Sequence, residues 1–223
     1  MSFFRAAFTL FIKDIRLEFR TKEMINTLLV FALLTVVIFN FAFPPGIIDP
    51  GLLASGIFWV TIIFTGTLAF NRSFSIETEE DSLRGLLLMP YDPTFILLGK
   101  SLFNFLLITI IEIVVYPIIT VLFRVSPAGS YWILILTVIL ATVGLTFIGT
   151  LQGAVLLRTR AREILLPLLF FPIIVPLIIA ATKATEAFFT GKIDPSSWLK
   201  FLALFDFIYI SATIFLFEYT LED

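Results

Sequence analysis

The chain has 223 residues, of which 59% are hydrophobic and 14% charged, and its formal net charge is −2. Soluble domains are about 45–50% apolar and about 25% charged, so too few polar residues remain here to coat a soluble core. The composition therefore predicts an integral membrane protein and gives no electrostatic case for nucleic-acid binding. The chain has no His and no Cys, which removes the commonest general base and the usual ligands of metals and haem iron.

The first predicted element is an amphipathic helix over residues 3–22. Its pattern is typical of a helix lying in the membrane interface, with aromatic rings among the acyl chains and cations toward anionic headgroups. The alternative is a helix packed within the bundle. The apolar face is formed by Phe4, Phe8, Phe11, Ile12, Ile15 and Phe19, and the basic face by Lys13, Arg16 and Arg20.

Six apolar stretches follow, each about the 20 residues that a helix needs to cross the hydrocarbon core. An open sheet would leave its edges unsatisfied in lipid, so the predicted fold is all-α. No repeat or linker indicates a second domain, and residues 1–223 are predicted to form one transmembrane domain. The predicted spans are 24–43, 52–71, 99–123, 131–157, 164–183 and 199–219, separated on one side by Pro/Gly-rich turns at 43–51, 124–130 and 190–197.

The distribution of Lys and Arg predicts the orientation. Eleven of the 15 basic residues precede the first span or lie in the loops after spans two and four, with their flanks; four lie on the other side. This asymmetry predicts that both termini are cytoplasmic.

Charged residues inside the spans are candidates for function. Glu112 lies mid-span, and Asp206 is predicted to lie nearer the outer boundary. For both, a helix–helix hydrogen bond that only holds the bundle together is the alternative. Lys183 and Glu186 close the fifth span at i,i+3 spacing and are expected to pair at the interface. Three prolines make that span a candidate moving part or a site of irregular packing: Pro167, Pro172 and Pro176.

The most polar internal stretch, RSFSIETEEDSLRGLLLMPYDP at 72–93, predicts a short cytoplasmic helix over about 77–89. Its carboxylates suit the positive end of a helix dipole, and its leucines form a ridge. An acidic start with an apolar ridge favours a protein groove over an anionic membrane surface, or over a helix folded back on the bundle. Asp92 is expected to cap the next helix, with Pro93 at its first position. The candidate partner-contact residues are Glu77, Glu80, Asp81, Leu83, Arg84, Leu86, Leu87, Leu88 and Pro90.

Gly99-Lys100-Ser101 matches only the tail of a phosphate-binding loop, because the position that needs the first glycine is Thr94. We therefore expect no ATP binding by this chain, and Lys100 is interpreted as a cytoplasmic anchor. No Gly-x-Ser-x-Gly motif or metal-ligand cluster is present. The chain is expected to be non-catalytic and to bind no cofactor itself.

Several of these stretches together resemble a known family over nearly the whole chain. They are Leu17-Glu18-Phe19-Arg20, Asn71-Arg72-Ser73-Phe74, Glu77 with Glu80, Leu83, Gly85-Leu86-Leu87-Leu88, Pro90, Gly99-Lys100, Phe217-Glu218-Tyr219 and Leu221-Glu222. With six spans and an amphipathic start, the chain resembles the membrane subunit of the cytochrome c maturation ABC transporter, the haem exporter protein B family.

The resemblance implies an ABC-2-like permease in the bacterial inner membrane, working as a homodimer with two copies of a separate ATPase subunit. It also implies haem-handling membrane subunits as partners, with ATP on the ATPase and haem as cargo of the complex. Residues 74–90 would then be the coupling element that sits in a groove of the ATPase. ATP hydrolysis would drive haem export or release of a haem-loaded chaperone, without iron ligation by this chain.

Besides an intramembrane enzyme, which the absence of His and Cys disfavours, two alternatives stay open at this point. One is an ABC-2-type permease for another lipid-like or amphipathic substrate. The other is an ion-coupled carrier that uses Glu112 and Asp206; transport should then survive without an ATPase and fail in Glu112→Gln.

Overall fold

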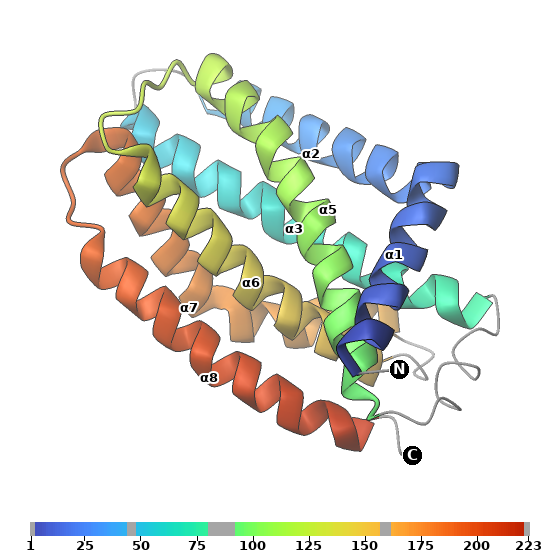
Figure 1. The fold of residues 1–223 in the computed structure, drawn as a ribbon. Helices are drawn as coiled ribbons and strands as arrows, with labels where there is room; N and C mark the ends of the chain where they lie inside the picture. Colours follow the sequence, from blue (N-terminus) through green and yellow to red (C-terminus); the bar gives the residue numbers. More distant parts are fainter. Residues whose placement is uncertain (1–2, 44–47, 80–91, 157–161, 221–223) are drawn as a thin grey trace.

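The computed structural model describes residues 3–43, 48–79, 92–156 and 162–220, and these form seven helices (Figure 1). The predicted all-α fold is confirmed, since the described residues contain no strand. The helices are α1 (Phe3–Thr21), α2 (Glu23–Ala42), α3 (Pro50–Glu79), α5 (Thr94–Leu122), α6 (Tyr131–Val155), α7 (Arg162–Thr190) and α8 (Ser196–Thr220).

Six of these helices, α2 to α8, are long and apolar enough to cross a membrane, as the hydropathy pattern predicts. Their bounds differ most from the prediction at three places. Helix α3 continues without a break to Glu79, so residues 77–79 end this helix and do not begin a separate one. Helix α5 begins at Thr94, and α7 continues to Thr190, so Lys183 and Glu186 lie inside α7 and pair at 2.8 Å.

Three Asp-Pro pairs mark the starts of α3, α5 and α8. In each, an Asp carboxylate oxygen accepts the backbone N–H two residues later, at 2.9 Å for Asp49, 2.8 Å for Asp92 and 3.0 Å for Asp194. The carboxylate satisfies an orphan donor of the first turn, and proline suits a position where no N–H is needed. The predicted cap at Asp92 is confirmed.

Helix α3 is the most enclosed span and packs between α2, α5, α6 and α7 (Figure 1). Trp59 and Phe70 are fully buried on it, and the indole N–H of Trp59 donates to the Thr185 hydroxyl of α7 at 2.9 Å. Small residues on α6 let these bulky groups approach: Gly149 lies against the Phe70 ring. Glycine contacts and hydroxyl bonds of this kind are the usual means of association between helices in lipid.

Helix α1 is amphipathic, as predicted, and lies against one end of α5 (Figure 1). Of the predicted apolar face, Phe4, Phe8 and Phe19 stay exposed and free for lipid, whereas Phe11 and Ile15 are partly buried against the core. The helix also has a third, packed face that the two-face interpretation did not include. That face consists of Ala6, Ala7, Leu10 and Asp14.

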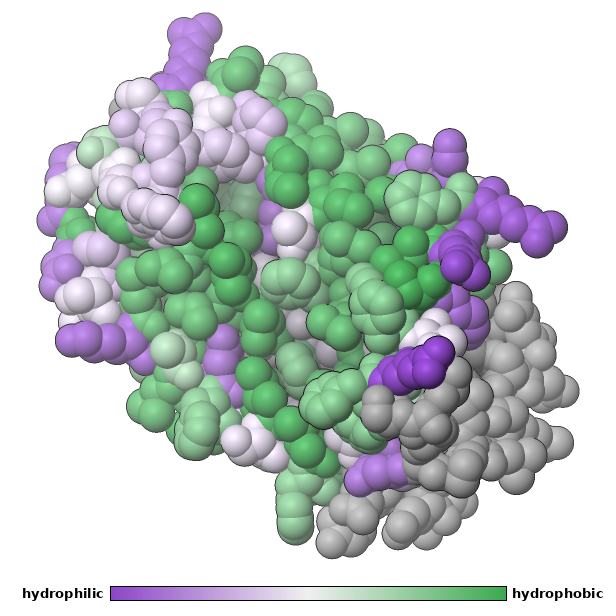
Figure 2. All heavy atoms as spheres, viewed as in Figure 1, coloured by the Kyte–Doolittle hydropathy of each residue, from purple (hydrophilic) through white to green (hydrophobic). Residues whose placement is uncertain are grey.

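The surface in Figure 2 is hydrophobic over its middle, with hydrophilic residues gathered toward the two ends. Large exposed apolar side chains on α2 and α8 include Leu34, Ile38, Leu204 and Phe207. A soluble protein would not expose so much contiguous apolar surface, whereas lipid tails accommodate it. The chain is a multi-pass membrane protein.

Candidate functional site

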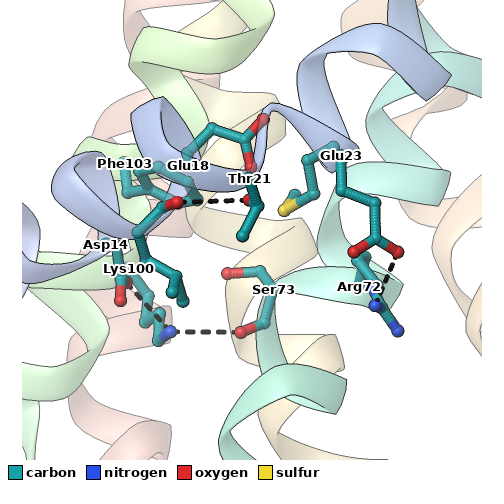
Figure 3. Close-up of a pocket in the computed structure, with 10 residues that line it drawn as sticks. Asp14, Glu18, Thr21, Glu23, Arg72, Ser73, Lys100 and Phe103 are labelled. Carbon is teal, nitrogen blue, oxygen red and sulfur yellow. Dashed lines mark hydrogen bonds and ion pairs between the residues drawn. The ribbon is translucent and has the colours of Figure 1, made fainter.

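A polar pocket of about 230 Å³ lies where α1, α3 and α5 meet (Figure 3). The Lys100 ammonium of α5 lies 2.9 Å from a carboxylate oxygen of Asp14 on α1 and donates to the backbone carbonyl of Ser73 on α3 at 3.1 Å. We call these three residues the α1–α3–α5 joint. One ammonium group thus links three helices.

The joint is almost closed to solvent, with side-chain exposures of 2% for Lys100 and 5% for Asp14. A lone buried charge would cost several kcal/mol, and a paired one is tolerated only with good geometry and extra hydrogen bonds. The Ser73 carbonyl supplies such a bond. The helices come this close because Gly99 has no side chain: a Cβ there would lie 2.9 Å from the Ala7 carbonyl oxygen.

Two further contacts fix the α1–α2 elbow at the rim of this pocket. The Glu18 carboxylate accepts the Ile25 backbone N–H at 2.8 Å, so it caps α2 from across the break at Lys22. Arg72 pairs with Glu23 at 2.9 Å, where both side chains are exposed. An exposed pair of this kind contributes less than about 1 kcal/mol, whereas the Glu18 cap is the stronger determinant of the elbow.

Lys100 was predicted to be a cytoplasmic surface anchor, and this is wrong because its side chain is buried. A lysine at the start of an apolar span is usually a surface anchor, but here the residue is buried by α1. Asp14 was not identified as its partner, because neighbouring Lys13 and Arg16 made the segment look uniformly basic. The spacing of Ala6, Leu10 and Asp14, four residues apart, was the available signal of a packed face.

Glu112 lies fully inside the bundle, at 2% exposure. The Thr142 hydroxyl of α6 donates to Glu112 Oε1 at 2.7 Å, which is a helix–helix bond of the kind considered in the sequence analysis. Its second oxygen, Oε2, has no hydrogen-bond partner in the described part of the chain. Glu112 therefore links α5 to α6 through Oε1, while Oε2 remains without a hydrogen bond in the described part of the chain.

Asp206 is buried at 5% exposure against Gly144 of α6, which leaves no room for a side chain of its own. Neither carboxylate oxygen has a hydrogen-bond partner among the described residues. Gly144 is two residues from Thr142, or about 3 Å along the axis of α6. Asp206 therefore lies nearly as deep as the Glu112 contact, and the predicted place nearer the outer boundary is wrong.

The two carboxylates are not brought together as a pair. Thr142 and Gly144 point to different sides of α6, because residues two apart on a helix do not face each other. No hydrogen bond or ion pair joins Glu112 to Asp206, both of which are described. Within the described ranges, no group of three or more Asp or Glu could hold a metal ion.

A family model described as "CcmB protein" matches residues 5–222. The chain belongs to the CcmB family. A relative from Haemophilus influenzae, "Heme exporter protein B", is 30% identical over 178 residues, covering 78% of this chain and 79% of the relative. Proteins of the same name from Paracoccus denitrificans and Escherichia coli are each 28% identical, covering 87% and 78% of this chain and 88% and 79% of the relatives.

The predicted partner-contact segment of this CcmB chain lies mostly outside the described residues. Glu77 is in the last turn of α3, and the other eight candidates fall within 80–91. The ends of the two helices that flank this segment are described, and the joint ties them together. Ser73 lies near the end of α3 and Lys100 near the start of α5.

Proposed function

We propose that the chain is the permease subunit of an ABC transporter complex for cytochrome c maturation, driven by a separate ATPase subunit. The observation that carries this proposal is the CcmB family match over residues 5–222, with curated relatives named as haem exporters. The sequence lacks the complete phosphate-binding motif, and in this proposal ATP is hydrolysed by the partner subunit.

In this proposal, residues 77–90 contact the ATPase, with Leu83, Leu86 and Leu87 entering a groove and the acidic residues setting the register. Movement of this segment would act on α3 and α5, because it connects them. The joint would pass the same movement to α1, since Lys100 contacts both Ser73 and Asp14. Binding of ATP to the partner would then shift the bundle between two arrangements.

The working unit would contain two copies of this chain and two ATPases, together with haem-handling membrane subunits. The bias of Lys and Arg supports placing both termini in the cytoplasm of a bacterial inner membrane. Figure 1 has the two termini at the same end of the molecule, which agrees with this placement.

The sharpest test is to replace Leu86 or Leu87 with Asp. A charge on the apolar ridge should lower co-purification of the cognate ATPase at least several-fold while the permease still inserts in the membrane. Ser130→Asp is the matched control, because it adds the same charge at an exposed helix cap on the other end of the bundle. Full recovery of the ATPase with Leu86→Asp would show that this segment is not the contact.

We further propose that this chain does not ligate haem iron. With no His or Cys in the sequence, the usual axial ligands would have to come from a partner subunit. The complex would use ATPase movement to export haem or to release a haem-loaded chaperone. The purified chain, mixed with haem, should give no defined axial-ligand absorption spectrum of its own; such a spectrum would refute the proposal.

A further inference from the structure

An apolar groove of about 300 Å³ lies on the outer side of the α1–α2 elbow. Helix α1 contributes Ile15 and Phe19 to it, and α5 contributes Phe103, Leu106, Leu107 and Ile110. We call it the elbow groove. It shares Glu18 and Phe103 with the polar pocket, so the two cavities adjoin along the same α1 segment.

The shape and lining of the elbow groove suit a hydrocarbon chain. Along α5 it extends from Phe103 to Ile110, about 10 Å at the rise of an α-helix. It therefore matches a stretch of acyl chain that lies parallel to a membrane-spanning helix. Its lining residues include no His, Cys, Met or Tyr, so the groove offers no usual ligand for an iron centre.

The rim of the elbow groove carries positive charge at the level where the first span begins. Lys22 lines the groove, is exposed, and directly precedes the span Glu23–Ala42. Arg16 and Arg20 of α1 are exposed too, although they do not line the groove. Within the described part of the chain these three cations form no ion pair. The one carboxylate at the rim, Glu18, is engaged by the Ile25 N–H.

We propose that the elbow groove is a binding site for an anionic phospholipid. One acyl chain lies along α5 between Phe103 and Ile110, and the phosphate group lies at Lys22, the one cation among the residues that line the groove. Exposed cations at this level gain from an anionic headgroup, and the apolar lining gains from a chain that excludes water. The bound lipid fills the angle between α1 and α2 and so supports the elbow that Glu18 caps.

Native mass spectrometry of the full chain in detergent tests this, with phosphatidylglycerol and phosphatidylcholine of identical acyl chains as probes. We expect the wild type to prefer phosphatidylglycerol, and Lys22→Gln to reduce that preference about fivefold, the value of one basic residue near an anionic surface. Lys200→Gln is the matched control, because it removes an exposed cation from α8 outside the groove.

A second pair of variants tests the chain-binding part. Ile110→Trp fills the groove and should lower retention of both lipids severalfold, whereas Ile113→Trp, on the exposed side of the same helix, should not. Equal binding of the two lipids to wild type, or unchanged binding in Ile110→Trp, would overturn the proposal. Displacement of the lipid by added haemin would overturn it too, by assigning the groove to the cargo. These readouts need no ATPase, so they stand apart from the coupling proposal.

Discussion

Lys100 has its ammonium group where the side chain is only 2% exposed, held by Asp14 and the Ser73 carbonyl. The ion pair adds little net stability, but breaking it costs much more. A buried pair contributes little over well-packed apolar residues, but removing one partner leaves the other charged and unsatisfied. The joint therefore fixes how α1, α3 and α5 pack against one another, and we expect single substitutions in it to lower the stability of the protein.

We predict that Lys100→Met lowers the free energy of unfolding by about 3 kcal/mol, because Asp14 then keeps only its longer 3.4 Å contact with the half-exposed Lys13 ammonium. The double variant Lys100→Met with Asp14→Leu should recover most of this loss. Thermal unfolding in detergent measures both, with Lys200→Met as the control for losing an exposed lysine. A double variant no more stable than Lys100→Met would contradict the proposed dependence on the pair.

At the scale of a single element, the glycines of α6 determine how closely the neighbouring helices pack against it. Gly144 makes room for Asp206 and Leu177, Gly149 for the Phe70 ring, and Gly153 for Phe74, which a Cβ would approach to 2.9 Å. These positions alternate with buried threonines and let α3, α7 and α8 pack closely against one helix. The order of contacts around α6 thus depends on residues that have almost no side chain.

Gly149→Ala should destabilise the bundle by about 1–3 kcal/mol, because the added methyl group would overlap the buried Phe70 ring and the core must shift. Gly56→Ala provides the matched control: it makes the same change in helix propensity on α3, where nothing lies within 4 Å of the new methyl group. Unfolding temperatures in one detergent compare the two. Equal effects would show that close packing at Gly149 is unimportant.

At the scale of the whole molecule, the end of the bundle away from α1 is closed by a contact distant in sequence. Lys192, between α7 and α8, donates to Asp49 at 3.1 Å, and Asp49 caps α3 as well. The hydrogen bond from Lys192, and next the Gly51 N–H, holds the pKa of the Asp49 carboxyl below its ordinary value of 3.8. The folded state therefore favours the ionised form of the Asp49 carboxyl.

This linkage has a defined sign. A lowered folded-state pKa contributes stability above pH 3.8, and the contribution declines as the pH falls below 3.8 through the lowered pKa. We predict that Asp49→Asn lowers the unfolding temperature at pH 6 and that its difference from wild type shrinks below pH 3.8. The effect should be smaller in a Lys192→Gln background. A difference that does not change with pH would show that ionisation of Asp49 does not contribute to stability, contrary to this prediction.

Much of the molecule could be predicted from local pattern. The six spans, the amphipathic α1 and the Asp92 cap follow from hydropathy, helical spacing and turn chemistry, which act over a few residues. The family resemblance was also carried by short stretches that the CcmB match bears out over residues 5–222. The segment 80–91, on which the coupling proposal depends, lies outside the described residues and stays a prediction.

Apart from helix bounds, the errors concern contacts between residues distant in sequence. Lys100 looked like a surface anchor until α1 covered it, and Asp206 looked shallow until Gly144 fixed its depth. The elbow groove needs three helices to exist at all.

The sequence by itself determined that this chain must lie in a membrane and that six helices cross it, because water exclusion and backbone hydrogen bonding act locally. Its short motifs also indicated the family. Only the tertiary structure decided which charges are buried and which of them meet. Burial and pairing depend on the neighbour that packs above a residue, and that neighbour is set by the whole bundle.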